Sequence, residues 1–167
     1  MAAGPCIGCG VVLDEIDGPT HRYMLSSPAC WKAYGRVLER EYSSPELADV
    51  HRLSVDAYAA QHPGEPTPQS MKSVGVHLIR LYLNLEKGFD VRESNRVMVR
   101  ISEQKHRFHW LTPPDSRGAM TVVDVLSTDG VQAHREAVQR WARSVWEAWR
   151  EHHPTVQAWA NVLFEEG

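Results

Sequence analysis

Three cysteines near the start of the chain, Cys6, Cys9 and Cys30, are the residues whose types and spacing point most directly to chemistry. Cys6 and Cys9 belong to a C-x-x-C-G motif, in which glycines allow the tight turn and close backbone approach that bring two thiolates to one metal ion. An odd number of cysteines does not suit a disulfide framework. The pattern therefore predicts a metal site, with Zn²⁺ as the expected ion.

The segment after this motif favours a metal site over a redox-active one. A redox C-x-x-C is expected at the first turn of a helix within a βαβ unit. Here residues 11–13, a Gly-Pro turn at 18–19 and residues 21–25 predict a small hairpin instead.

Cys30 falls in the first turn of a predicted helix. Ser27 suits the N-cap and Pro28 the first helical position, so Cys30 meets free backbone N–H groups and the positive helix end, which favour a thiolate. A treble-clef zinc site has the same order of elements: a knuckle, then a hairpin, then a cysteine at the start of a helix. Position 33, where such a site has its next ligand, is Ala33, so the fourth ligand must come from elsewhere.

Apolar spacing of three and four, interrupted by proline and glycine, predicts helices along the rest of the chain. The longest carries Val138, Trp141, Val145 and Trp149 on one stripe, which predicts a core face. The fold class expected is all-α: a helical bundle with a small N-terminal treble-clef-like zinc-knuckle hairpin, in one domain over 1–167, with 1–30 as the knuckle and 31–167 as the helical body. The expected helices span 30–42, 46–62, 69–87, 90–104, 121–124, 129–152 and 155–164.

Helix lengths narrow the choice of a fourth ligand. If the second helix folds back on the first, the rise of about 1.5 Å per residue brings Cys30 level with about residue 57. His62 then lies near the Cys30 end of the hairpin, and His21 is the local alternative between the thiols. Asp56, His51 and an open site with water complete the alternatives, and the sequence does not choose among them.

The same folding-back predicts a second polar constellation. It brings His77, on the third helix, level with about residue 52, so that His51 and His77 face each other. With Asp56 and Tyr58 they would line a pocket for a small molecule, in which the imidazoles carry protons or act as ligands.

Composition excludes several classes of function. The 167 residues carry a net charge of −3 with a pI near 6.3, which is not the basic footprint of a nucleic-acid-binding protein. No apolar run reaches the roughly 18 residues of a membrane span, and the start has neither the basic nor the apolar region of a secretory signal. We therefore expect a cytoplasmic protein with no nucleic-acid or membrane partner; its oligomeric state is not indicated.

Several motifs are similar to those of a family of bacterial proteins of unknown function. They are the C-x-x-C-G knuckle, GPTHRYM at 18–24, SPACW at 27–31, HRLSVDAYAAQHPG at 51–64 and VHLIR at 76–80. The resemblance extends over nearly the whole chain. It implies that the three cysteines and His21, His51, Asp56, His62 and His77 belong to the family's motifs, but it implies no activity.

Two functions from different classes follow from these residues. The first is a zinc-binding helical protein in which zinc is mainly structural and the His/Asp-lined pocket takes a small molecule. The second is a zinc-dependent enzyme, of hydrolase or lyase type, acting on a small molecule at an open metal site. A histidine that completes the coordination would favour the first, and a water there the second.

Overall fold

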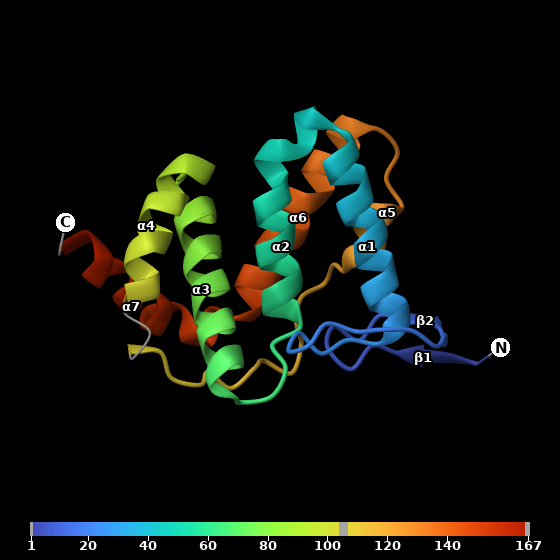
Figure 1. The fold of residues 1–167 in the computed structure, drawn as a ribbon, viewed down its shortest axis with the longest axis horizontal. Helices are drawn as coiled ribbons and strands as arrows, with labels where there is room; N and C mark the ends of the chain where they lie inside the picture. Colours follow the sequence, from blue (N-terminus) through green and yellow to red (C-terminus); the bar gives the residue numbers. More distant parts are fainter. Residues whose placement is uncertain (1, 104–106, 166–167) are drawn as a thin grey trace.

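The computed structural model describes residues 2–103 and 107–165 of the chain. Seven α-helices and one short hairpin make up most of this described part, so the prediction of an all-α fold with an N-terminal hairpin is confirmed (Figure 1). The strands are β1 (Ala3–Pro5) and β2 (Val12–Asp14). The helices are α1 (Pro28–Ser43), α2 (Ala48–Gln61), α3 (Pro68–Leu85), α4 (Val91–Glu103), α5 (Val122–Leu126), α6 (Val131–Ala148) and α7 (His153–Glu165), with 3₁₀ turns at Pro45–Leu47 and Arg150–His152.

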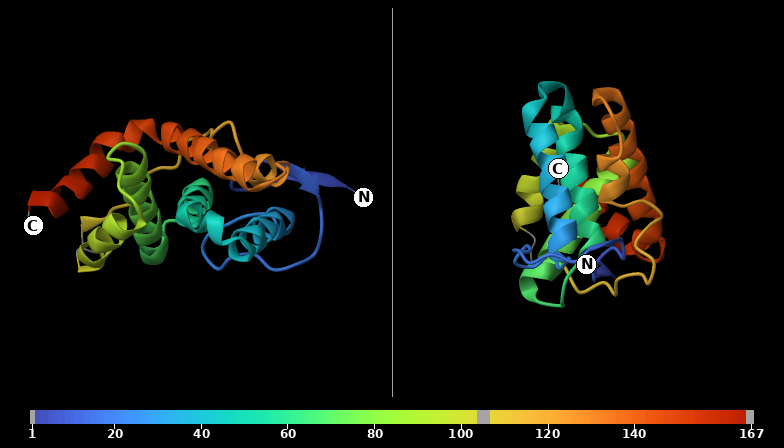
Figure 2. Two further views of the ribbon diagram at one scale, coloured as in Figure 1. Left: turned by 90° about the horizontal axis from the view of Figure 1, so that it is seen from above. Right: turned by 90° about the vertical axis from the view of Figure 1, so that its right-hand side faces the viewer.

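The helices form two layers. Helices α1 to α4 stand side by side in chain order, and α6 and α7 run behind them as a nearly continuous rod, as the view from above shows (Figure 2). Helix α2 packs against α3 in its own layer and against α6 in the other, and α3 also packs against α7. The N-terminal hairpin lies at the foot of α1 and α2, beside the start of α1 and the end of α2 (Figure 1).

The core lies between these layers and is rich in tryptophan. The predicted stripe on α6 is buried: Trp141, Val145 and Trp149 are each 0% exposed, and Trp146 beside them is 1% exposed. Burial of such large side chains contributes roughly 1.5–3 kcal/mol each, so the packing of α6 against α2 contributes strongly to the stability of the fold.

Capping residues explain most helix starts. The Ser27 hydroxyl accepts a hydrogen bond from the Cys30 amide at 3.2 Å, with Pro28 in the first helical position, as the sequence predicts. Thr121 and Asp124 form the predicted capping box of α5. No helix in the described ranges has the length and apolar character needed to cross a membrane.

The hairpin prediction is correct in place but wrong in pairing. Strand β2 pairs antiparallel with β1, Ala3 opposite Asp14, whereas residues 21–25 contain bends and no strand. The reason is that the C-x-x-C-G turn reverses the chain at once, with the Cys6 amide bonded to the Val11 carbonyl at 2.8 Å. The two strands therefore flank the knuckle instead of following it.

Two predicted helix ends also differ. The helix expected over 129–152 ends at Ala148, and a 3₁₀ turn leads into α7, which accepts Pro154 because a proline in the first turn loses no intrahelical hydrogen bond. Helix α4 is described to Glu103, and residue 104, at which its predicted range ends, lies outside the described residues.

Candidate metal centre

Four side chains meet at the foot of the α1–α2 hairpin. The Sγ atoms of Cys6, Cys9 and Cys30 and a ring nitrogen of His62 all lie within 4.8 Å of one another. Cys9 Sγ is 3.8 Å from Cys30 Sγ, and His62 Nε2 is 3.5 Å from Cys30 Sγ. Cys30 and His62 are both 0% exposed, and Cys6 is 3% exposed. The arrangement is a cluster of three sulfurs and one nitrogen, which is a possible metal-binding site.

Helix geometry explains how residues so far apart in sequence meet here. Helices α1 and α2 run antiparallel, so the first turn of α1, with Cys30, lies level with the end of α2, where His62 is the C-cap residue. The knuckle carrying Cys6 and Cys9 covers the imidazole from outside. An added Cβ on Gly8 would stand 2.2 Å from His62 Cδ2, so only glycine fits between the knuckle and this ring.

The backbone fixes the tautomer of His62. Its Nδ1 lies 2.7 Å from the carbonyl oxygen of Tyr58, one turn earlier on α2. A carbonyl only accepts, so Nδ1 carries the proton and Nε2, which faces the sulfurs, keeps its lone pair. A metal-bound histidine is held in this way by a hydrogen bond from its other nitrogen.

Backbone and side-chain donors surround two of the sulfurs. Cys6 Sγ accepts hydrogen bonds from the amides of Gly8 at 3.4 Å and Ser27 at 3.3 Å. Cys30 Sγ lies 3.4 Å from the Tyr58 hydroxyl. Such donors stabilise the thiolate form, which is the form that binds metals.

Without a metal, the three sulfurs share their protons unequally. Hydrogen bonds from Cys30 and Cys9 hold the pKa of Cys6 far below its ordinary value. The hydrogen bonds with Cys6 and Cys9, together with burial, raise the pKa of Cys30 far above its ordinary value. For Cys9 the hydrogen bond with Cys30 lowers the pKa, but the contact with Cys6 and burial outweigh it and raise that pKa to about 11. In the absence of a metal, the shared protons therefore favour Cys30 and Cys9 over Cys6.

One residue that the sequence did not single out, Arg117, joins the knuckle to the helices. Its Nη1 donates to the Gly8 carbonyl at 2.7 Å, and its Nε donates to the Pro114 carbonyl. Burial lowers the pKa of this guanidinium, and the Coulomb attraction of Cys6 and Cys9 opposes that shift. Arg117 therefore places a positive charge beside the sulfur cluster.

Residues 4–150 match the model of a family of unknown function, DUF5946. The chain belongs to the DUF5946 family. The resemblance noted from the motifs is thereby confirmed at the level of the family. Neither a search of curated proteins nor a search of solved structures finds a match to this DUF5946 chain.

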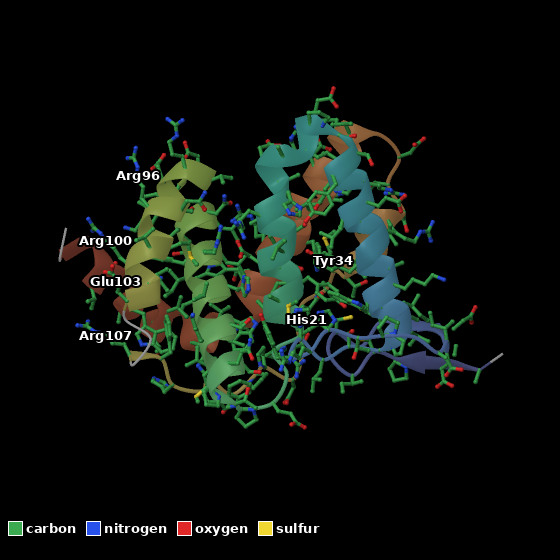
Figure 3. All side chains as sticks on the ribbon, viewed as in Figure 1. His21, Tyr34, Arg96, Arg100, Glu103 and Arg107 are labelled. Atoms are coloured by element: carbon green, nitrogen blue, oxygen red, sulfur yellow. The ribbon has the colours of Figure 1, made fainter. Side chains whose placement is uncertain are left out.

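His21, the alternative fourth ligand, lies outside the sulfur cluster in this DUF5946 protein. Its Nδ1 accepts hydrogen bonds from the amides of Tyr23 and Met24, each at 3.2 Å, and its ring packs edge-on against Trp31. Figure 3 shows His21 near the lower end of α2. The structure thus brings His62, and not His21, to the three cysteines.

The four residues expected to line a pocket are divided among three sets of contacts. Tyr58 touches Cys30 and stacks on the His62 ring, with centroids 3.9 Å apart. Asp56 accepts a hydrogen bond from His77 Nδ1 at 2.7 Å. His51 contacts a different carboxylate, that of Glu41.

That carboxylate, Glu41, was not singled out from the sequence. It is 4% exposed and accepts hydrogen bonds from His51 Nδ1 at 3.1 Å, the Ser54 hydroxyl at 2.6 Å and His134 Nε2 at 2.8 Å. It therefore ties α1 to α2 and α6. Its spacing of seven from Tyr34 and four from Val37, both buried, was the available sign that Glu41 faces inward.

Proposed function

We propose that this DUF5946 protein binds one Zn²⁺ through Cys6, Cys9, Cys30 and His62, and that the ion is mainly structural. The observation that carries the proposal is the closure of the cluster by His62, whose free Nε2 faces the sulfurs from a buried position. The ion would fasten the N-terminal hairpin to the ends of α1 and α2.

Two separations between donor atoms match the geometry of a zinc site, and the others lie within 4.8 Å. Zn–S bonds of about 2.3 Å and Zn–N bonds of about 2.0–2.1 Å at tetrahedral angles require S···S separations of about 3.8 Å and S···N separations of about 3.6 Å. The structure has 3.8 Å between the sulfurs of Cys9 and Cys30 and 3.5 Å between Cys30 Sγ and His62 Nε2. Three thiolates and one imidazole are also a common donor set of structural zinc sites.

The alternative, an enzyme acting at an open metal site, is less well supported. A catalytic zinc keeps one coordination position for water or substrate, whereas four protein donors fill a tetrahedral shell. Three thiolates also place negative charge on the ion and weaken it as a Lewis acid. The burial of Cys30 and His62 leaves little access for a substrate.

Metal content of matched histidine variants tests the proposal. We expect about one zinc per chain by elemental mass spectrometry in the unmodified protein, and loss of most of it in Cys30→Ser and His62→Ala. His21→Gln is the matched control, because His21 lies between the same motifs but outside the cluster, and it should keep its zinc. The proposal is wrong if the unmodified protein holds no stoichiometric zinc, or if His62→Ala keeps it and His21→Gln loses it.

The donor count distinguishes the structural role from the catalytic one. Cobalt(II) in place of zinc has an absorption spectrum that depends on the number and type of its ligands. We expect the spectrum of a four-coordinate site with three sulfurs that does not change when azide is added. A spectrum that responds to azide would show an exchangeable position and would favour the enzyme.

A further inference from the structure

A cavity of about 470 Å³ lies at the end of α1 that is far from the sulfur cluster. The last two turns of α1 form one wall of this cavity, and the loop before α6 together with the first turn of α6 forms the other (Figure 1). Cys30 and Ser43, at the two ends of α1, are about 20 Å apart at the helical rise per residue. The cavity is therefore separate from the candidate metal centre.

The first turn of α6 presents unfilled hydrogen-bond donors at this cavity. Gly130, the N-cap residue, lines the cavity with Val131 and has no side chain that could accept from these donors. Among the described residues, the amides of Val131, Gln132 and Ala133 have no hydrogen-bond acceptor. No acidic residue lies in the first turn either. The positive end of an 18-residue helix therefore lies at the cavity, which favours an anionic acceptor there.

His134, which also lines the cavity, presents the opposite chemistry. Its side chain is only 3% exposed, and the Glu41 carboxylate accepts from its Nε2 at 2.8 Å. An ionised carboxylate only accepts, so in the neutral ring Nε2 carries the proton and Nδ1 keeps a lone pair. Nδ1 is buried, yet it has no hydrogen-bond partner among the described residues. Because helical side chains lean toward the N-terminus of their helix, this acceptor lies over the same turn as the free amides.

Charged side chains of both signs complete the wall of the cavity. Arg36 and Glu39 come from α1 and Asp129 from the loop before α6, and all three are exposed. None of them forms an ion pair within the part of the chain that the structure describes. Arg40 instead donates to three carbonyls at the end of α5, and so holds this wall in place. A guanidinium is thus available to an anion, and two carboxylates are available to a cation.

We propose that this cavity binds a small carboxylate that carries a hydrogen-bond donor on the neighbouring carbon, as α-amino acids and α-hydroxy acids do. The ligand carboxylate accepts from the first-turn amides of α6 and pairs with Arg36, while the neighbouring donor group contacts His134 Nδ1. One small molecule can reach both ends of this arrangement, because residues 131 and 134 differ by only about 4.5 Å along the helix axis. Glu39 and Asp129 favour an ammonium group as the donor.

An uncapped helix end next to a buried water molecule is the simplest alternative, but it accounts for less. Asp129 supplies negative charge near the start of α6, yet no side chain caps this helix. A water molecule at His134 Nδ1 would satisfy that atom alone. Neither explains why a buried acceptor, free amides and an unpaired guanidinium line the same cavity. A ligand with a carboxylate and an adjacent donor uses all of them.

Three acids of nearly equal size test the proposal on the unmodified protein as purified. L-alanine has an ammonium group beside its carboxylate, L-lactate has a hydroxyl group there, and propionate has neither. We expect the NMR signals of the Gly130 and Val131 amides and of the His134 ring to shift saturably with L-alanine or L-lactate at constant ionic strength. Propionate should bind at least about ten-fold more weakly, because it leaves the buried acceptor unpaired.

The order of the three affinities decides the outcome. L-alanine should bind most tightly, because Glu39 and Asp129 attract its ammonium group. Tighter binding of L-lactate would support the site and assign the donor to a hydroxyl group. The proposal is wrong if neither L-alanine nor L-lactate gives a saturable shift, or if propionate binds as tightly as both.

Substitutions on the two walls then locate the ligand. Arg36→Gln should weaken the binding of L-alanine about five-fold. Lys32→Gln, at an exposed position one turn earlier on α1 and outside the cavity, should not alter it. His134→Gln keeps an amide that can donate to Glu41 but leaves no acceptor in place of Nδ1, so this variant should lose the preference for L-alanine over propionate.

Zinc content should stay unchanged in all three variants, which separates this proposal from the proposed zinc site. An unaltered preference for L-alanine in a folded His134→Gln variant would refute the role of Nδ1. Equal effects of Arg36→Gln and Lys32→Gln would show that the ligand does not lie in this cavity.

Discussion

Substitution of Gly8 by alanine is the sharpest way to disturb the proposed zinc site without touching a ligand. The added Cβ would stand 2.2 Å from His62 Cδ2 and 2.7 Å from the Leu25 carbonyl oxygen, where ordinary contacts begin near 3.4 Å. The first contact falls short by 1.2 Å (3.4 minus 2.2). Metal–ligand distances tolerate only about 0.2 Å, so either the imidazole or the knuckle must leave its place. Loss of one ligand should weaken zinc binding at least about 100-fold, since even an outer-shell partner is worth about 10–100-fold.

Chelator competition measures this effect, with Gly35→Ala as the matched control. Gly35 lies in α1, and an added Cβ there has nothing within 4 Å, so zinc affinity should not change. Alanine should instead stabilise the helix by roughly 0.5–1 kcal/mol. Circular dichroism should show the helices of Gly8→Ala intact. A zinc affinity of Gly8→Ala within three-fold of the unmodified protein would refute the placement of His62 beneath the knuckle.

Three further predictions concern protons, charge and the buried carboxylate. Zinc binding must displace the protons of Cys9 and Cys30, because the pKa values of both thiols are raised. The zinc affinity should therefore fall by about 100-fold per pH unit as the pH is lowered from 9 to 7. Release of one proton or fewer per zinc, measured by chelator competition across this pH range, would contradict the prediction. Arg117→Gln should weaken zinc binding about 10–100-fold in the same assay, because it removes the hydrogen bond to the Gly8 carbonyl. Substitution of the exposed Arg92 by glutamine should leave zinc binding unchanged. Equal effects of the two substitutions would show that the hydrogen bond from Arg117 to Gly8 is unimportant for zinc binding. Glu41→Ala should lower the free energy of unfolding, measured in urea, by about 3 kcal/mol, because it leaves the buried donors of Ser54 and His134 unpaired. The zinc content should not change. A loss below about 1 kcal/mol would show that the hydrogen bonds of Glu41 contribute little to stability.

Local signals predicted most of the helical fold. Proline, glycine and capping residues divide the chain at the positions where the helices begin, and Ser27 and Thr121 cap their helices as expected. The hairpin was harder, because three-residue strands are too short for alternation to show which partners pair. Its pairing depends on the turn of the knuckle, whose hydrogen bonds cannot be read from spacing.

The candidate site could be predicted only as far as its local part. The C-x-x-C-G spacing and the capped start of α1 single out the three cysteines, but the choice between His21 and His62 depends on how α1 and α2 pack. Arg117 reaches a knuckle carbonyl 109 residues away in sequence, and no pattern within either segment indicates that contact. Glu41 is similar, since a carboxylate on a helix is ordinarily solvated and its partners come from two other helices.

The hairpin depends on the helices far more than they depend on it. The end residues of β1 and β2 are exposed, whereas the tryptophan-rich core between α2 and α6 is completed by helical residues. We therefore expect residues 2–27 to open while the helices stay folded, and the proposed metal ion would hold this segment closed. Amide hydrogen exchange in residues 2–27, but not in α6, would then slow down when metal is bound. The availability of metal would thus determine whether the N-terminal segment is ordered.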